Sequence, residues 1–200
     1  VTKIIWLERG LYEDDLTFEG LLPGPTGKKE AYTVITTGGH IDEFCRFVSP
    51  DTILLAEVTA EEAAHDPIAR ENRKRLEENY NILKQATDQD GNKFKIIRMH
   101  LPHVIYDYLQ PGDVVYDYIS ELEYKGGHKF PKGEKVMVIA ASSYHNYLVT
   151  NGVVLAQKYW KPGMPGIVKK QDEEAIAILQ SVFPDRKIVP LDPMAVNIGG

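Results

Sequence analysis

The sequence predicts an α/β fold built from repeated ββαβ modules. Two stretches, about 40–99 and 135–191, each contain a hairpin pattern, then a helical pattern, then one more apolar run of strand length. Their sequence identity is slight, so the repeat is one of pattern. Modules that recur at this period bury their apolar faces against their neighbours, as in solenoids and propellers. We therefore expect a single, partial domain over residues 1–200.

Length and composition are those of an ordinary soluble globular protein, with 200 residues, 43% hydrophobic and 26% charged. The formal net charge of −6 gives no electrostatic support for binding nucleic acid or an anionic membrane. No apolar run approaches the roughly 20 residues of a membrane helix, and no signal peptide is visible at Val1. The single cysteine, Cys45, excludes an internal disulfide. We expect a cytoplasmic protein, although residues upstream of Val1 could still direct secretion.

The first part of the chain precedes the two complete modules. Residues 2–7 (TKIIWL) are short and apolar and predict a buried strand, the last one of an earlier module. Residues 16–35 are rich in Gly and Pro around PGPTGKK and predict an inserted loop. Long loops are uncommon and often functional. Two alternatives therefore stand: a mobile flap over a pocket, or an insertion without a role.

For the first module, the sequence predicts two strands, a helix and a third strand. A strand at 40–48, a turn at 49–51 and a second strand at 52–58 make a hairpin. A helix over 67–86 begins at a proline, which suits the first helical turn, and has an apolar face amid charge. The apolar run FKIIRM, 94–99, predicts the closing strand.

Residues 101–133 carry many prolines, glycines and tyrosines and predict irregular structure, with one strand near 114–119. At their start, His100 and His103 have a spacing seen in zinc motifs. Pro102 lies between them and disrupts the helix that such motifs need, and no third ligand is near in the sequence. We expect no metal site there.

The second module opens with the apolar run KVMVIAAS at 135–142. A hairpin is expected from 144–150 and 153–159, because the Asn-Gly pair between them supports the positive dihedral angles of a tight turn. Asp172 is expected to cap the helix that follows. The run RKIVPL, 186–191, is expected to be the closing strand.

The candidate site is the stretch TGGHIDEFCRFV at 37–48. In a strand, His40 and Asp42 would project from the same face. An imidazole beside a carboxylate, just after a backbone free to bend at Gly38 and Gly39, suits acid/base chemistry. The alternative is a surface hydrogen-bonded pair, which the spacing alone favours. If the pair is catalytic, both side chains should face the axis of the modules, at the end of a pocket.

The charged and polar residues near this pair have simpler interpretations. Cys45 would point to the face opposite His40, as a small core residue. Arg46 is expected to pair with an acid such as Glu43 or Glu57 on a solvated face.

Three further polar residues accompany the site. Asp14 and Asp15 could reach it, but we expect both to face water. Asn146 lies in the second hairpin, and no chemistry in the sequence demands it.

Four segments carry a resemblance to a known family. They are IIWL-x-x-GL-x-x-DD at 4–15, TGGHIDEFCRF at 37–47, SYHNYLVTNGVVL at 143–155 and FPDRKIVPL at 183–191. In this order they resemble the C-terminal half of agmatine deiminases and Porphyromonas-type peptidyl-arginine deiminases. The closing NIGG, 197–200, is similar to the start of that family's glycine-rich stretch before Ile-His-Cys. Together the segments cover nearly the whole chain, and Gly-His-Ile-Asp is the most diagnostic.

The resemblance implies the guanidine-modifying (pentein) α/β-propeller of five ββαβ modules. It also implies hydrolytic deimination of agmatine, as in putrescine biosynthesis, or of free or peptidyl arginine. A cysteine thiolate attacks the guanidinium carbon, and neither a metal nor an organic cofactor is required. By resemblance, His40 is the general acid/base, Asp42 holds the guanidinium, and Gly199 and Gly200 contact the substrate.

The sequence also departs from the family pattern. The family's nucleophile would lie just beyond Gly200, its other catalytic acids would precede Val1, and Cys45 does not match the nucleophile's position. We therefore expect the chain alone to be inactive and to associate with a missing N-terminal half or with a second copy. The interval between Asp15 and Thr37 is much longer than in agmatine deiminases, which leaves the guanidine substrate open. The alternative function is a non-catalytic or regulatory propeller that binds a guanidine ligand or a partner.

Overall fold

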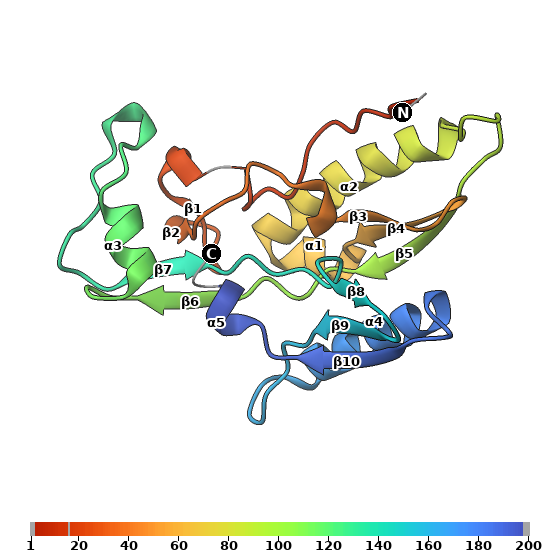
Figure 1. Ribbon diagram of the computed structural model, residues 1–200. Helices are drawn as coiled ribbons and strands as arrows, with labels where there is room; N and C mark the ends of the chain where they lie inside the picture. Colours follow the sequence, from red (N-terminus) through yellow and green to blue (C-terminus); the bar gives the residue numbers. More distant parts are fainter. Residues whose placement is uncertain (1–2, 16, 198–200) are drawn as a thin grey trace.

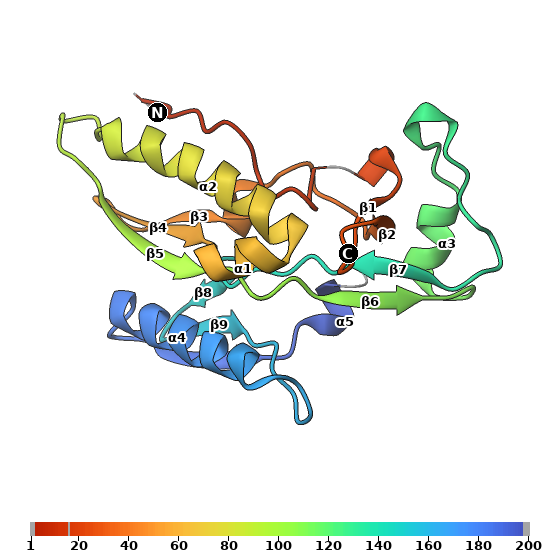
Figure 2. The same ribbon diagram turned by 180° about the vertical axis from the view of Figure 1, so that it is seen from behind.

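The computed structural model describes residues 3–15 and 17–197, and these residues form three small mixed sheets (Figure 1). The sheets have the strand orders β3-β4-β5, β10-β9-β8 and β1-β2-β7-β6. Helices α2 and α4 each cover one sheet, on the same side of the molecule (Figure 2). In the described ranges we find no helix with the length and apolar character to span a membrane.

The first sheet confirms the ββαβ order predicted for residues 40–99. It contains β3 (Cys45–Ser49), β4 (Thr52–Glu57) and β5 (Lys95–His100), and α1 (Ala60–His65) and α2 (Pro67–Gln85) connect β4 to β5. Strand β3 pairs antiparallel with β4, and β4 pairs parallel with β5. The N-terminus of α2 forms where expected, because Asp66 accepts a hydrogen bond from the Ala69 N–H and Pro67 follows it.

The second sheet contains β8 (Leu148–Thr150), β9 (Val153–Gln157) and β10 (Lys187–Leu191), and α4 (Gly166–Val182) connects β9 to β10. The ββαβ order is again as predicted, but the run 135–142, expected to open this module, lies in the third sheet. Asp172 does not cap the helix. The helix begins six residues earlier, and Asp172 is buried within it. Its carboxylate accepts hydrogen bonds from the Tyr144 hydroxyl at 2.7 Å and from the backbone N–H groups of Tyr159 and Trp160 at 3.0 and 2.8 Å.

The third sheet corrects the prediction that residues 16–35 form a loop without regular structure. The described part of this segment forms a 3₁₀ turn (Thr17–Glu19), β1 (Leu22–Pro23) and β2 (Lys29–Thr33). Strand β2 pairs parallel with β7 (Val136–Ile139), which pairs antiparallel with β6 (Tyr106–Leu109). The Gly and Pro residues make the tight turn between β1 and β2, whereas the side chain of Tyr32 is buried in the core.

Two other expected strands are absent from the described residues. The segment predicted as a strand near 114–119 is helix α3 (Val114–Ser120), which packs Val115, Tyr116 and Ile119 against the third sheet. Residues 3–9 run in extended form beside α2, with Trp6 exposed, instead of forming a buried strand (Figure 1). Two short elements complete the chain, a 3₁₀ turn (Lys125–Gly127) and α5 (Met194–Asn197). The assignment of residues 1–200 to one domain stays a prediction.

Candidate active site

His40 and Asp42 lie beside each other, but not in a strand. Residues Ile41–Glu43 form a 3₁₀ turn just before β3, in which the Glu43 N–H donates to the His40 carbonyl at 3.3 Å. The prediction of a strand from residue 40 is therefore wrong at its start, and period-two alternation does not bring the two side chains together. His40 Nδ1 nevertheless lies 4.0 Å from Asp42 Oδ1. The side chains are 62% and 49% exposed, and neither lines the cavity described below, so the expected position of the pair at the end of a pocket stays a prediction.

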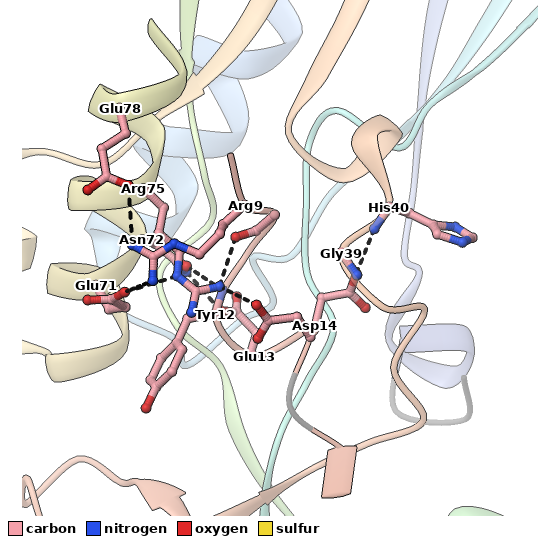
Figure 3. Close-up of polar contacts among 12 residues, drawn as sticks. Arg9, Tyr12, Glu13, Asp14, Gly39, His40, Glu71, Asn72, Arg75 and Glu78 are labelled. Atoms are coloured by element: carbon pink, nitrogen blue, oxygen red, sulfur yellow. Dashed lines mark hydrogen bonds and ion pairs between the residues drawn. The ribbon is translucent and has the colours of Figure 1, made fainter. Parts of the chain in front are cut away.

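A buried carboxylate, that of Asp14, holds the loop that carries His40. Oδ2 of Asp14 accepts a hydrogen bond from the Thr37 hydroxyl at 2.6 Å. It also accepts hydrogen bonds from the backbone N–H groups of Gly39 and His40, at 2.8 and 3.0 Å (Figure 3). Oδ1 accepts a fourth from the Thr37 N–H at 2.8 Å. Asp14 is 6% exposed, so the expectation that it faces water is wrong. Because 26 residues separate it from His40 in the chain, sequence spacing gave no signal for this contact.

The segment that carries Asp14 is itself fixed to helix α2. Arg75 of α2 donates to Asp15 Oδ2 at 2.6 Å, to Glu71 at 3.0 Å and to the Gly10 carbonyl at 3.1 Å (Figure 3). Asp15 therefore faces a buried guanidinium instead of water, which is a second correction. On the adjacent turn, Asn72 accepts from the Tyr12 N–H at 2.7 Å.

A close approach of two glycines joins this segment to the site loop. A Cβ atom on Gly10 would lie 2.6 Å from the Gly39 Cα atom, which no side chain tolerates. Gly39 and its neighbour Gly38 also have positive φ angles of 83° and 85°, a region that favours glycine. The glycine pair therefore lets the loop bend and lets the two backbones touch.

Glu43 is a further acid beside the pair, and its environment is unusual for a carboxyl group. Burial raises the pKa of Glu43 to about 7, against the opposing effect of a hydrogen bond that the Asn146 amide donates at 2.7 Å. The Ser143 hydroxyl donates to the Glu43 carbonyl. Asn146, to which the sequence assigned no role, thus connects the second module to the site.

Arg46 and Cys45 have structural environments. The Arg46 guanidinium donates to the carbonyls of His145 and Tyr147 and lies 4.2 Å from the centre of the Tyr147 ring. It does not pair with Glu43 or Glu57, because its side chain crosses to the second module. Cys45 is a buried core residue, as expected, and burial raises the pKa of its thiol to about 12. It is therefore a poor nucleophile at neutral pH.

No metal site accompanies these groups. Among the described residues, no three or more His, Cys, Asp or Glu side chains gather in a way that could hold a metal ion. His100 and His103 instead face separate acids, with His100 3.4 Å from Glu174 and His103 3.1 Å from Glu62. Gly199 and Gly200, expected to contact the substrate, lie outside the described residues.

We expect Asp14→Asn to destabilise the folded chain by about 1–2 kcal/mol. The reason is geometric: both carboxylate oxygens accept hydrogen bonds, so either orientation of the amide places its NH₂ group against a backbone N–H. Urea denaturation followed by circular dichroism measures the change in the free energy of unfolding. Asp90→Asn, in an exposed turn, is the matched control and should change it by less than about 0.5 kcal/mol. An Asp14→Asn chain as stable as the control would remove Asp14 from this role.

The comparisons with known proteins agree on one family. The family model described as Porphyromonas-type peptidyl-arginine deiminase matches residues 26–200. An agmatine deiminase of Medicago truncatula is 30% identical over 195 residues, which cover 96% of this chain and 40% of that protein. An agmatine deiminase of Pseudomonas aeruginosa is 28% identical over 200 residues, covering 100% of this chain and 42% of that protein. The chain thus spans about two-fifths of the length of these curated relatives.

A solved structure extends the likeness to the fold. The agmatine deiminase of Enterococcus faecalis superposes with a TM-score of 0.54 at 21% identity, covering 82% of this chain and 38% of that one. At this identity the likeness concerns the fold alone, and it agrees with the mixed α/β sheets described above.

Proposed function

Because the chain belongs to the Porphyromonas-type peptidyl-arginine deiminase family, we propose that it contributes the proton-transfer part of a guanidine deiminase site. The observation that carries the proposal is the His40–Asp42 pair, 4.0 Å apart on a loop that the buried Asp14 carboxylate holds in place. A base and a carboxylate on a fixed loop can orient a cationic substrate and exchange protons with it. The three sheets would form part of an α/β-propeller of ββαβ modules.

The chemistry explains why an imidazole and a carboxylate should stand together. A guanidinium carbon is a poor electrophile, because its charge is spread over three nitrogens. Asp42 would grip these nitrogens and hold the carbon in line with the attacking thiolate. His40 would give the departing ammonia its proton, then take one from the water that releases the ureido product. The net reaction consumes one guanidine and one water and yields ammonia and a ureido compound.

The thiolate is not supplied by Cys45. Its sulfur is buried, and the raised pKa of the thiol keeps it protonated at neutral pH. Gly199 and Gly200 are proposed to contact the substrate, as the resemblance implies. Agmatine and free or peptidyl arginine are the substrates proposed for the whole protein, and a cytoplasmic location stays a prediction.

The proposal is tested with a longer protein that carries this chain. Agmatine, free arginine and an arginine-containing peptide are each incubated with it, and ammonia and the ureido product are quantified together. We expect equal amounts of ammonia and ureido product from at least one of the three guanidines. Failure of all three to react, in a protein that binds none of them, would contradict the proposal.

A second function is favoured by the burial of Cys45, the single cysteine of the chain. Without an accessible thiol, these residues by themselves could bind a guanidinium but could not deiminate it. The same experiment separates the two functions. Saturable binding of a guanidine that never gives product would identify a non-catalytic or regulatory guanidine-binding protein.

A further inference from the structure

A cavity of about 440 Å³ lies on the other side of the segment that carries Asp14. It is enclosed by the start of α2 with α1, the linker after β5, the residues after β7 and the first turn of α4. Glu13 lines this cavity and points to Asn72 of α2, whereas its neighbour Asp14 points to Gly39 and His40 (Figure 3). The cavity is therefore separate from the candidate active site, although one short segment borders both.

The wall of the cavity is apolar with an excess of acid. Val58, Leu101, Val104, Ile105 and Val168 supply aliphatic surface. The carboxylates are those of Glu13, Glu62 and Asp66, and none of the described lining residues is Lys or Arg. A cavity of this size and character suits a small ligand with an apolar body and one positive charge.

Two of the three acids already have structural partners. Glu62 caps α1 through Thr59 and contacts His103 at 3.1 Å. Asp66 caps α2 and accepts a hydrogen bond from the Tyr106 hydroxyl at 2.9 Å. These contacts explain the two acids without a ligand.

Glu13 is different, because its carboxylate forms no ion pair within the described residues, although its own backbone N–H and the more distant charge of Arg75 act on it. Glu13 is 8% exposed, and the Asn72 amide donates a hydrogen bond to its Oε2 atom at 2.8 Å. Within the described residues, no Lys, Arg or His lies within ion-pair distance of its carboxylate. Burial raises the pKa of Glu13 to about 7, against the opposing effects of the Asn72 hydrogen bond and the charge of Arg75. A buried carboxylate without a cation is unfavourable, and a bound cation would relieve it.

We propose that this cavity binds a small organic cation, an alkylammonium or alkylguanidinium, with its charged head on Glu13 and its alkyl body against the aliphatic wall. A metal ion does not fit, because the described His, Asp and Glu side chains of this region do not gather into a group that could ligate one. The proposal concerns a site apart from His40 and Asp42 and does not depend on the proposed deiminase function.

The test is calorimetric titration of the 200-residue chain with n-butylammonium and n-butylguanidinium chloride, and with n-butanol as the neutral isostere. We expect at least one cation to bind in preference to butanol. Glu13→Gln, which keeps an acceptor for Asn72, should weaken that binding by about tenfold or more. Glu134→Gln, at an exposed position outside the cavity, should leave it unchanged. Equal binding of cation and butanol, or equal affinity in the Glu13→Gln chain, would overturn the proposal.

A second variant keeps the test decisive if Glu13→Gln does not fold. Ile167 lies at the rim of the cavity and is 46% exposed, so Ile167→Trp should obstruct the entrance without disturbing the core. We expect it to abolish cation binding. We also expect the bound cation to shift the NMR methyl signals of Val168 and Ala140 in the unmodified chain. Unshifted methyl signals with retained binding would place the cation elsewhere and refute the assignment.

Discussion

Replacing His40 by alanine in a longer, active protein that carries this chain should lower the kcat for ammonia release by about 10²–10⁴-fold. The imidazole is proposed to transfer both protons of the reaction, whereas Asp42 is proposed to hold the substrate. The loss should therefore appear in kcat, with KM changed little. Asp42→Asn should instead raise KM more than it lowers kcat, because the charge that pairs with the guanidinium is gone. Steady-state kinetics on the preferred guanidine separates the two effects.

Cys45→Ala is the matched control for this experiment. Cys45 lies five residues from His40 and is buried in the core of the first module. Its replacement removes a thiol without touching the site loop, so kcat should stay within a few-fold of the unmodified protein. Full activity of the His40→Ala protein would refute the acid/base role of His40, and loss of activity in the Cys45→Ala protein would reopen the identity of the nucleophile.

The elements with strong local signals could be predicted from the sequence. Strand β4 contains the apolar run Ile53–Ala56, all of it buried, and α2 has a capping aspartate, a proline and a periodic apolar face. The Asn-Gly turn between β8 and β9 identified the second hairpin. Both ββαβ modules follow from these signals, because each element is determined by residues close to it in the chain.

The third sheet could not be predicted, because its pairing is non-local. Strand β2 pairs with β7, and their partners Ala31 and Met137 are separated by more than half of the chain. The Gly and Pro residues around Gly24 indicate a turn but do not say whether its flanks are free or paired. Asp172 was misread for a similar reason. Its carboxylate accepts hydrogen bonds from backbone N–H groups that precede α4, and not from the first turn of the helix.

The candidate site, too, could be predicted from the sequence only in part. The Gly-His-Ile-Asp motif located His40 and Asp42, but the strand expected there is a 3₁₀ turn that follows two glycines with positive φ. The groups that fix the loop come from distant residues, Asp14 from the N-terminal segment and Arg75 from α2. No spacing rule connects such residues. The assignment of catalytic roles to His40 and Asp42 stays a prediction that the His40→Ala experiment addresses.

Burial of His145 makes the free energy of unfolding depend on pH. Its side chain is 0% exposed, and neither ring nitrogen has a hydrogen-bond partner among the described residues. Burial, with the nearby charges of Arg46 and Arg98, lowers the pKa of His145 to about 3 from its usual 6.5. The folded chain therefore holds this imidazole neutral at pH values where the unfolded chain would protonate it.

The last prediction follows from this difference in proton binding. Between pH 6.5 and 3 the unfolded state binds more protons at His145 than the folded state does, so the free energy of unfolding falls as the pH falls. The slope from one such group approaches about 1.4 kcal/mol for each pH unit. Glu13 and Glu43 act in the opposite sense, because their raised pKa values favour the folded state on acidification.

The measurement is therefore a difference: urea denaturation of the unmodified and His145→Leu chains at pH 7, 6, 5 and 4. The stability of the His145→Leu chain relative to the unmodified chain should increase by about 2–3 kcal/mol from pH 7 to 4. His65→Gln, at an exposed position of α1, should show no such increase, and parallel pH profiles for the unmodified and His145→Leu chains would show that His145 is not held neutral by burial.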